Sequence, residues 1–197
     1  MIGIIDYGAG NLRSVQNTLA EIGAAYKLVH TPEQLRAASK IILPGVGHFG
    51  QMMRALQMMS MPEAIRKNIG DGVPFLGICL GLQALYESSE EAPEVKGLEL
   101  LPGTVKRFQH DLRIPHMGWN EIAPLRDAAI LRNLGAKPYL YFAHSYYCPV
   151  GDATAAVCDY GVKYTAVVES ENIYGVQFHP EKSGDLGLRI VKNFVNL

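Results

Sequence analysis

Two kinds of hydrophobic pattern alternate along the first half of the chain. Short apolar runs are typical of buried strands, and stretches with apolar residues about three or four positions apart are typical of helices. Expected strands cover residues 2–6, 26–30, 40–43 and 73–78, and expected helices cover 12–22, a short segment from 32, 51–59, 62–69 and 80–87. Because strands that alternate with helices pair in parallel and carry helices on both faces, this half predicts a three-layer α/β/α fold.

The pattern changes in the second half, where strand-like runs follow one another through short connections. These runs cover residues 104–108, 139–147, 154–159, 163–169 and 173–178, and a final amphipathic helix is expected over 185–197. Such runs predict antiparallel strands added to the mostly parallel central sheet. With 197 residues and no linker or low-complexity tract, residues 1–197 are expected to form a single domain.

Composition narrows the class of protein. Hydrophobic residues make up 48% of the chain and charged residues 19%, which excludes intrinsic disorder. The net charge of −1 provides no field that would attract nucleic acid, so no nucleic-acid partner is expected. Three cysteines without a close pair indicate a reducing compartment. With no signal-peptide pattern and no apolar run long enough to cross a membrane, the sequence predicts a cytoplasmic protein without a membrane partner.

Cys79 stands between two glycines in Gly77-Ile78-Cys79-Leu80-Gly81, where an apolar run ends and a helical pattern begins. This spacing is typical of a nucleophile elbow, a sharp strand-to-helix turn whose strained backbone leaves no room for neighbouring side chains. A lone cysteine is more often an inert core residue, but the flanking glycines favour the catalytic interpretation. We therefore predict that Cys79 is a nucleophile and that the N–H of Leu80 binds a developing oxyanion.

A candidate base lies near the end of the chain, in Gln177-Phe178-His179-Pro180-Glu181. Pro180 biases His179 toward an extended backbone, in which every second side chain projects to the same side, so Glu181 is expected to reach the imidazole. Cysteine, histidine and glutamate then form a triad in which the carboxylate orients the imidazole, the imidazole moves the proton and the thiolate attacks.

The remaining histidines lack such a carboxylate and give no indication of a metal site. We interpret His144 as a structural hydrogen-bonding residue, and the others as solvated or hydrogen-bonded loop residues: His30, His48, His110 and His116. No metal and no cofactor is expected.

Two glycine-rich loops follow expected strands. The loop Pro44-Gly45-Val46-Gly47 has freely oriented backbone amides that can complete an oxyanion hole, although it is also consistent with a simple turn. The loop Gly8-Ala9-Gly10 is not a dinucleotide fingerprint, because Arg13 occupies the position of the third glycine. Nucleotide binding at these loops is therefore excluded.

Together these motifs resemble those of the class I, triad-type glutamine amidotransferases, and the resemblance covers nearly the whole chain. Within that family, three segments are similar to the glutaminase subunits of imidazole glycerol phosphate synthases: Asp6-Tyr7-Gly8-Ala9-Gly10-Asn11, Pro44-Gly45-Val46-Gly47 and Ile114-Pro115-His116-Met117-Gly118-Trp119-Asn120.

This resemblance implies that the chain hydrolyses glutamine to glutamate and ammonia. The ammonia would pass to a (β/α)₈ cyclase subunit, in a heterodimer that makes imidazole glycerol phosphate and an aminoimidazole carboxamide ribotide during histidine biosynthesis. The resemblance also implies roles for individual residues: Gln83, Ser145 and Tyr146 hold the glutamine, Gly47 belongs to the oxyanion strand, and Asn11, Trp119, Tyr141 and Lys182 face the cyclase.

Three other functions stay open at this point. The chain is also consistent with a glutaminase subunit of a different ammonia-using synthase, which would keep the site and change the docking face. A scaffolding subunit without turnover and a cysteine hydrolase of another amide are the remaining alternatives.

Overall fold

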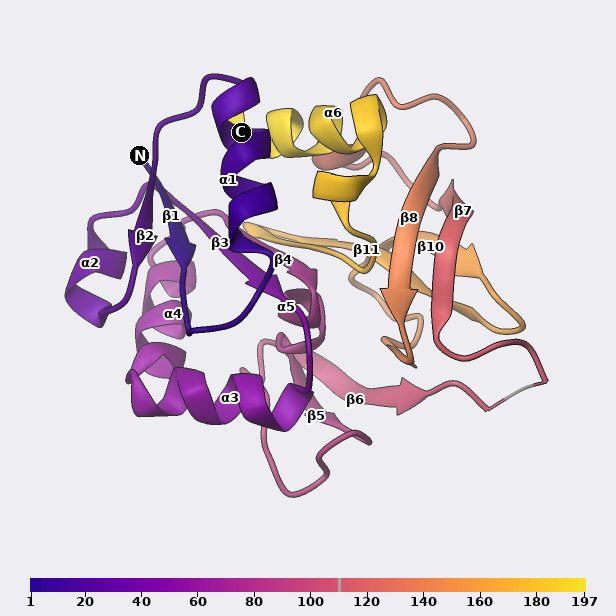
Figure 1. Ribbon diagram of the computed structural model, residues 1–197, viewed down its shortest axis with the longest axis horizontal. Coiled ribbons are helices and arrows are strands. Elements are labelled where there is room, and N and C mark those ends of the chain that lie inside the picture. Colours follow the sequence, from indigo (N-terminus) through magenta and orange to yellow (C-terminus); the bar gives the residue numbers. More distant parts are fainter. Residues whose placement is uncertain (110) are drawn as a thin grey trace.

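The computed structural model describes residues 1–109 and 111–197 as an α/β fold built on a large mixed sheet (Figure 1). His110 lies outside the described residues, so its interpretation as a loop residue is not tested. The sheet has nine strands in the order β2-β1-β3-β4-β12-β11-β10-β7-β8. From one edge to the other these are Tyr26–Val29, Ile2–Ile5, Lys40–Gly45, Phe75–Cys79, Ile173–Val176, Lys163–Ser170, Thr154–Asp159, His116–Pro124 and Tyr139–His144.

The sheet changes character at β12. Strands β2, β1, β3, β4 and β12 pair in parallel, whereas β12, β11, β10, β7 and β8 pair antiparallel. The expected fold class, a parallel first half with antiparallel strands added in the second, is therefore confirmed. Because β4 and β12 are parallel neighbours, their carboxyl ends lie side by side although nearly a hundred residues separate them.

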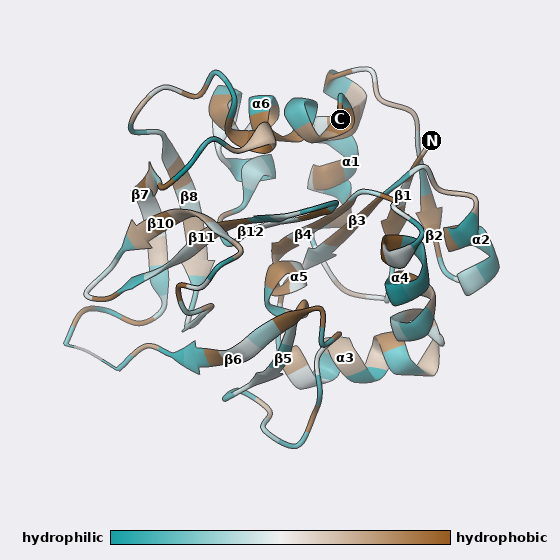
Figure 2. Ribbon diagram, turned by 180° about the vertical axis from the view of Figure 1, so that it is seen from behind, coloured by the Kyte–Doolittle hydropathy of each residue, from teal (hydrophilic) through white to brown (hydrophobic). Residues whose placement is uncertain are grey.

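Helices cover both faces of the sheet. On one face α1 (Leu12–Glu21) and α6 (Gly184–Val195) pack against a core that includes Val15, Leu19 and Phe194. A second core lies on the other face, under α2 (Pro32–Arg36), α3 (Phe49–Met58) and α4 (Met61–Gly70). Figure 2 shows the matching pattern, with hydrophobic strands in the parallel part and two-coloured, amphipathic helices around them.

Two expected elements are shorter than predicted, and one strand was not predicted. The helix expected over residues 80–87 ends early, because α5 covers only Leu80–Gln83 and the chain then forms β5 (Tyr86–Ser89). The strand expected over 139–147 splits into β8 and β9 (Tyr146–Tyr147), which joins a separate small sheet with β5 and β6 (Leu101–Arg107). Strand β7 was not expected, because its alternation is interrupted by Gly118 and by polar residues on its exposed side.

Within the described residues, every helix is too short or too polar to cross a membrane. The same residues contain no group of three or more His, Cys, Asp and Glu side chains that could hold a metal ion.

Candidate active site

Cys79 occupies a strained turn between β4 and α5. Its backbone angles are φ 53° and ψ −105°, a positive φ that side-chain-bearing residues rarely adopt. The turn is packed so tightly that a Cβ atom on Gly77 would strike the backbone of Gly81, and one on Gly81 would strike the carbonyl oxygen of Leu43. The glycines on either side of Cys79 are therefore required by close backbone contact, as the elbow pattern predicts.

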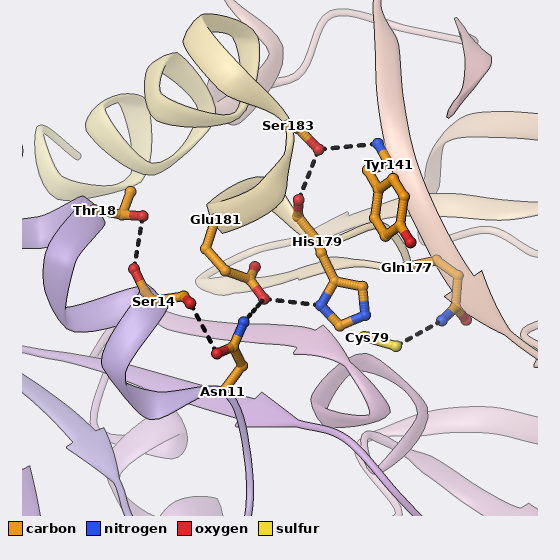
Figure 3. Close-up of polar contacts among 9 residues, drawn as sticks. All are labelled: Asn11, Ser14, Thr18, Cys79, Tyr141, Gln177, His179, Glu181 and Ser183. Atoms are coloured by element: carbon orange, nitrogen blue, oxygen red, sulfur yellow. Dashed lines mark hydrogen bonds and ion pairs between the residues drawn. The ribbon is translucent and has the colours of Figure 1, made fainter. Parts of the chain in front are cut away.

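His179 follows β12 and lies beside Cys79, with its ring directed at the sulfur (Figure 3). On its other side, Nδ1 donates a hydrogen bond to Glu181 Oε1 at 2.9 Å, and the side chains of His179 and Glu181 are only 4% and 2% exposed. Burial disfavours a charged imidazole, but the adjacent Cys79 and Glu181 outweigh that effect and raise the pKa of His179 from 6.5 to about 10. The imidazole of His179 is therefore able to hold a proton at neutral pH.

The chain geometry after His179 differs from the sequence-based expectation. His179 itself is extended, but Pro180–Lys182 form a 3₁₀ turn rather than continuing the strand. Glu181 reaches the imidazole because this turn folds the carboxylate back, not because alternate residues of an extended chain share a side. Pro180 suits the turn, since its fixed φ is preorganised for a first helical position.

Asn11 holds the carboxylate of Glu181 from the opposite side. Its Nδ2 donates to Glu181 Oε1 at 3.3 Å, while its Oδ1 accepts a hydrogen bond from Ser14 Oγ at 2.8 Å (Figure 3). The resemblance suggested only a partner-facing role for Asn11. The structure adds that the half-buried side chain is part of the hydrogen-bond network around Glu181 and His179.

Gln177 is a site residue that the sequence reasoning missed. Its side chain is fully buried, and its Nε2 lies 3.6 Å from the sulfur of Cys79 as a hydrogen-bond donor. Its Oε1 accepts from Gln83 Nε2 at 3.1 Å, and the same Nε2 donates to the carbonyl of Tyr146 at 2.9 Å. The sequence could have indicated Gln177, because it lies two residues before His179 and alternate residues of an extended chain project to the same side.

A cleft of about 210 Å³ opens over Cys79 and His179. Most of the predicted oxyanion and substrate-binding residues line it: Val46, Gly47, Leu80, Gln83, Ser145 and Tyr146. Gly45 lies behind the cleft, opposite Cys79 in the register of β3 and β4, where a Cβ atom would overlap Leu80 and Gly81. Glu91 also lines the cleft, and its Oε2 accepts the N–H of Phe49 at 2.7 Å. It was not predicted, because it lies in an irregular segment with no motif.

Three of the predicted partner-facing residues gather beside the site. Trp119 is 56% exposed, and its ring meets that of Tyr141 edge-on at 6.2 Å. The ammonium of Lys182 lies 5.8 Å from the centre of the Tyr141 ring. The backbone carbonyl of Tyr141 accepts the N–H of His179 at 2.8 Å. A backbone hydrogen bond therefore connects this exposed aromatic cluster to the candidate base.

Comparisons with known proteins identify the family of the chain. The family model "Glutamine amidotransferase class-I" matches residues 3–197. Among solved structures, a glutamine amidotransferase has a TM-score of 0.79 at 20% identity, covering 99% of this chain and 97% of that chain. PurLQS from Thermotoga maritima has a TM-score of 0.74 at 20% identity, with the same two coverages. At these identities the structures support the fold alone.

Curated relatives are much more similar in sequence. Imidazole glycerol phosphate synthase subunit HisH of Methanothermobacter thermautotrophicus is 50% identical, covering 100% of this chain and 98% of its own. Subunit HisH of Methanocaldococcus jannaschii is 45% identical, with 100% of both chains covered. The chain therefore belongs to the glutamine amidotransferase class-I family and, within it, to the HisH subunits of imidazole glycerol phosphate synthase.

Proposed function

We propose that this chain hydrolyses the side-chain amide of glutamine, with Cys79 as nucleophile, His179 as proton carrier and Glu181 as the group that orients the imidazole. The observation that carries the proposal is the arrangement around Cys79. A buried cysteine with positive φ, at a strand-to-helix turn, faces a buried histidine that is hydrogen-bonded to a carboxylate. An inert core cysteine has no need of a strained backbone or of an oriented histidine.

The reaction follows from these contacts. The Cys79 thiolate attacks the amide carbon of glutamine, and backbone N–H groups of the Gly45–Gly47 loop and of Leu80 stabilise the oxyanion. His179 protonates the nitrogen, the carbon–nitrogen bond breaks and ammonia leaves, with a thioester on Cys79. Water, deprotonated by the now neutral His179, then attacks the thioester, so that glutamate is released and the thiolate and imidazolium form again.

The cleft suits the rest of the glutamine molecule. Gln83 donates both amide protons, to Tyr146 and to Gln177, which leaves its Oε1 as a hydrogen-bond acceptor. The Glu91 carboxylate supplies the negative charge that the α-ammonium group requires. Ser145 and Tyr146 contribute polar backbone and hydroxyl groups on the facing wall.

We further propose that the chain delivers its ammonia to a (β/α)₈ cyclase subunit, as part of histidine biosynthesis, in the cytoplasm, and that residues 1–197 act as one domain. The name of the HisH relatives describes them as subunits of a synthase. The exposed cluster of Trp119, Tyr141 and Lys182 beside His179 is a suitable docking surface, since aromatic and cationic side chains are enriched at interfaces. A sealed route between subunits keeps ammonia from being protonated in water.

Selective alkylation tests the nucleophile. Burial raises the pKa of the Cys148 thiol well above its usual value and that of Cys158 to about 11, so both should resist iodoacetamide. Cys79 should be modified, and glutamine should protect it, as measured by peptide mass spectrometry. Equal labelling of the three thiols, or no protection by glutamine, would contradict the proposal.

Activity measurements with purified cyclase complete the test. Cys79→Ala should abolish glutamate formation while glutamine still raises the melting temperature, and Cys158→Ala should remain active. Trp119→Ala should weaken the heterodimer in size-exclusion chromatography at micromolar concentrations. Glutaminase turnover by Cys79→Ala would reject the triad, and a mixture that never forms a complex would reject the partner.

A further inference from the structure

Two buried histidines outside the triad share one tyrosine hydroxyl. His116 on β7 and His144 on β8 are directly opposite each other in the antiparallel register. The hydroxyl of Tyr164, on β11, lies 3.0 Å from His116 Nδ1 and 3.2 Å from His144 Nε2. All three side chains are buried, and the mechanism above uses none of them.

The direction of each hydrogen bond in this row of side chains follows from its last acceptor, the backbone carbonyl of Tyr146. His144 Nδ1 lies 2.8 Å from the carbonyl oxygen of Tyr146, which has no proton, so Nδ1 must be the donor. Burial lowers the pKa of His144 to about 3, so the ring is neutral and its Nε2 carries a lone pair. The Tyr164 hydroxyl therefore donates to His144, and its oxygen accepts from His116 Nδ1–H.

The contact between His116 and Asn120, at the other end of the row, is consistent with this direction. A neutral His116 with its proton on Nδ1 has a lone pair on Nε2, and Asn120 Nδ2 lies 3.4 Å away as a donor. The amide of Asn120 is fixed in this orientation, because its Nδ2 also donates to the Asp159 carbonyl at 3.1 Å and its Oδ1 accepts the N–H of Glu121 at 2.8 Å. Four donors thus point the same way, from Asn120 through His116, Tyr164 and His144 to the backbone of Tyr146.

Among residues 1–109 and 111–197, the thiol of Cys158 also lies within hydrogen-bonding reach of the Tyr164 hydroxyl. Burial raises the pKa of this thiol to about 11, so it stays protonated at neutral pH. A neutral thiol is a weak acceptor compared with the imidazole nitrogen of His144, and it can itself donate to the tyrosine oxygen. The direction of the chain is therefore unchanged.

This row of hydrogen bonds ends at Tyr146, in the wall of the glutamine cleft. The Tyr146 carbonyl accepts from both His144 and Gln83, and Ser145 and Tyr146 line the cleft. We propose that His116, Tyr164 and His144 are positioning residues for glutamine: their one-directional hydrogen-bond chain holds the Ser145–Tyr146 backbone in the conformation that binds the substrate. This inference rests on the proposed glutaminase activity.

The kinetic test removes the hydroxyl that joins the two imidazoles. Tyr164→Phe leaves His144 Nε2 and His116 Nδ1 without their shared partner, and we expect KM for glutamine to rise about tenfold while kcat stays within about twofold. Tyr160→Phe is the matched control. Its ring stacks on His116 at 3.9 Å, but its hydroxyl donates to the Arg113 carbonyl, outside the chain, so KM should not change.

A KM for Tyr164→Phe equal to that of the control would overturn the proposal, as would a fall in kcat alone. A purely structural role would lower the melting temperature and leave KM of the folded enzyme unchanged. If the wild-type enzyme with its cyclase releases no ammonia from glutamine, the glutaminase assignment fails instead. The hydrogen-bond chain is then tested by NMR spectroscopy, which does not depend on activity.

The tautomers provide a second test, on the wild-type protein. Long-range ¹⁵N–¹H NMR spectra should show a proton on Nδ1 of both His116 and His144, with the His144 ring neutral, whereas free histidine prefers Nε2–H. An unprotonated Nδ1 at either position, or a charged His144 ring at neutral pH, would contradict the chain. This measurement stays informative even if Tyr164→Phe fails to fold.

Discussion

The two turns that meet in the site are held in place by different means. At the end of β4, backbone contact decides the position of Cys79, because Gly77 and Gly81 pack against neighbouring backbone with no room for a Cβ atom. At the end of β12, side-chain hydrogen bonds decide the position of His179. Ser183 Oγ donates to the His179 carbonyl at 2.6 Å and accepts the Tyr141 N–H at 3.0 Å, while Asn11 and Glu181 hold the ring.

Because of this difference, we expect the nucleophile and the base to respond differently to substitution. A close-packed backbone turn cannot adapt to an added carbon atom, so damage there should affect folding. A hydrogen-bonded turn can lose one group and keep its shape, so damage there should affect catalysis in graded steps.

The largest effect is expected at the nucleophile turn. In Gly81→Ala, the new methyl group would overlap the Leu43 carbonyl, and we expect the free energy of unfolding to fall by about 5 kcal/mol or the protein not to fold. Gly70→Ala is the control, since Gly70 ends α4 with open space around it and should gain up to about 1 kcal/mol. Urea denaturation measures both, and similar stabilities for the two variants would remove the distinction between the turns.

A smaller effect is expected on acidification, in the antiparallel half. Burial lowers the pKa of His144 from 6.5 to about 3, so below pH 6.5 the unfolded chain binds a proton that the folded chain refuses. Stability from this group is complete above pH 6.5 and is lost as the pH falls toward 3, at roughly 1.4 kcal/mol per unit, so that about 2 kcal/mol is lost by pH 5. His144→Gln should flatten this part of the curve of unfolding free energy against pH. Identical slopes in the two proteins would show that His144 does not cause the loss.

Glu181→Ala tests the base turn at the carboxylate. The His179 ring loses the acceptor that fixes its tautomer but keeps its place beside Cys79, so we expect kcat to fall about 100-fold with the fold intact. The loss should be smaller than that of Cys79→Ala, measured as ammonia release in the presence of the cyclase. A fall in stability as large as that of Gly81→Ala would contradict the graded response.

The smallest effect is expected for Asn11→Ala. Asn11 contributes one longer, half-buried hydrogen bond to Glu181, so kcat should fall only about fivefold, equivalent to about 1 kcal/mol. In a double-mutant cycle the Asn11→Ala loss should disappear when Glu181 is already alanine, because Asn11 acts through that carboxylate. An undiminished loss in the double variant would instead indicate a separate role for Asn11, such as contact with the partner.

The sequence predicted the parts of the fold that local patterns encode. The parallel strands, the amphipathic helices and the strained turn at Cys79 all have short-range signatures, and the structure contains them. The boundaries failed where tertiary pairing overrides local pattern, as in the short α5, the division of the strand near Ser145 and the unexpected β7. The catalytic and partner-facing roles of the site residues stay predictions.

By itself, the sequence determined which residue types carry the chemistry: a cysteine between glycines and a histidine followed by proline and glutamate. Only the tertiary structure decided how they meet, because the parallel pairing of β4 with β12 joins two chain ends that no local pattern connects. It also places Asn11 against Glu181, 170 residues away in the sequence, and Gln177 against Cys79, 98 residues away. Hydrogen bonds across such separations depend on the folded sheet, and spacing along the chain carries no record of them.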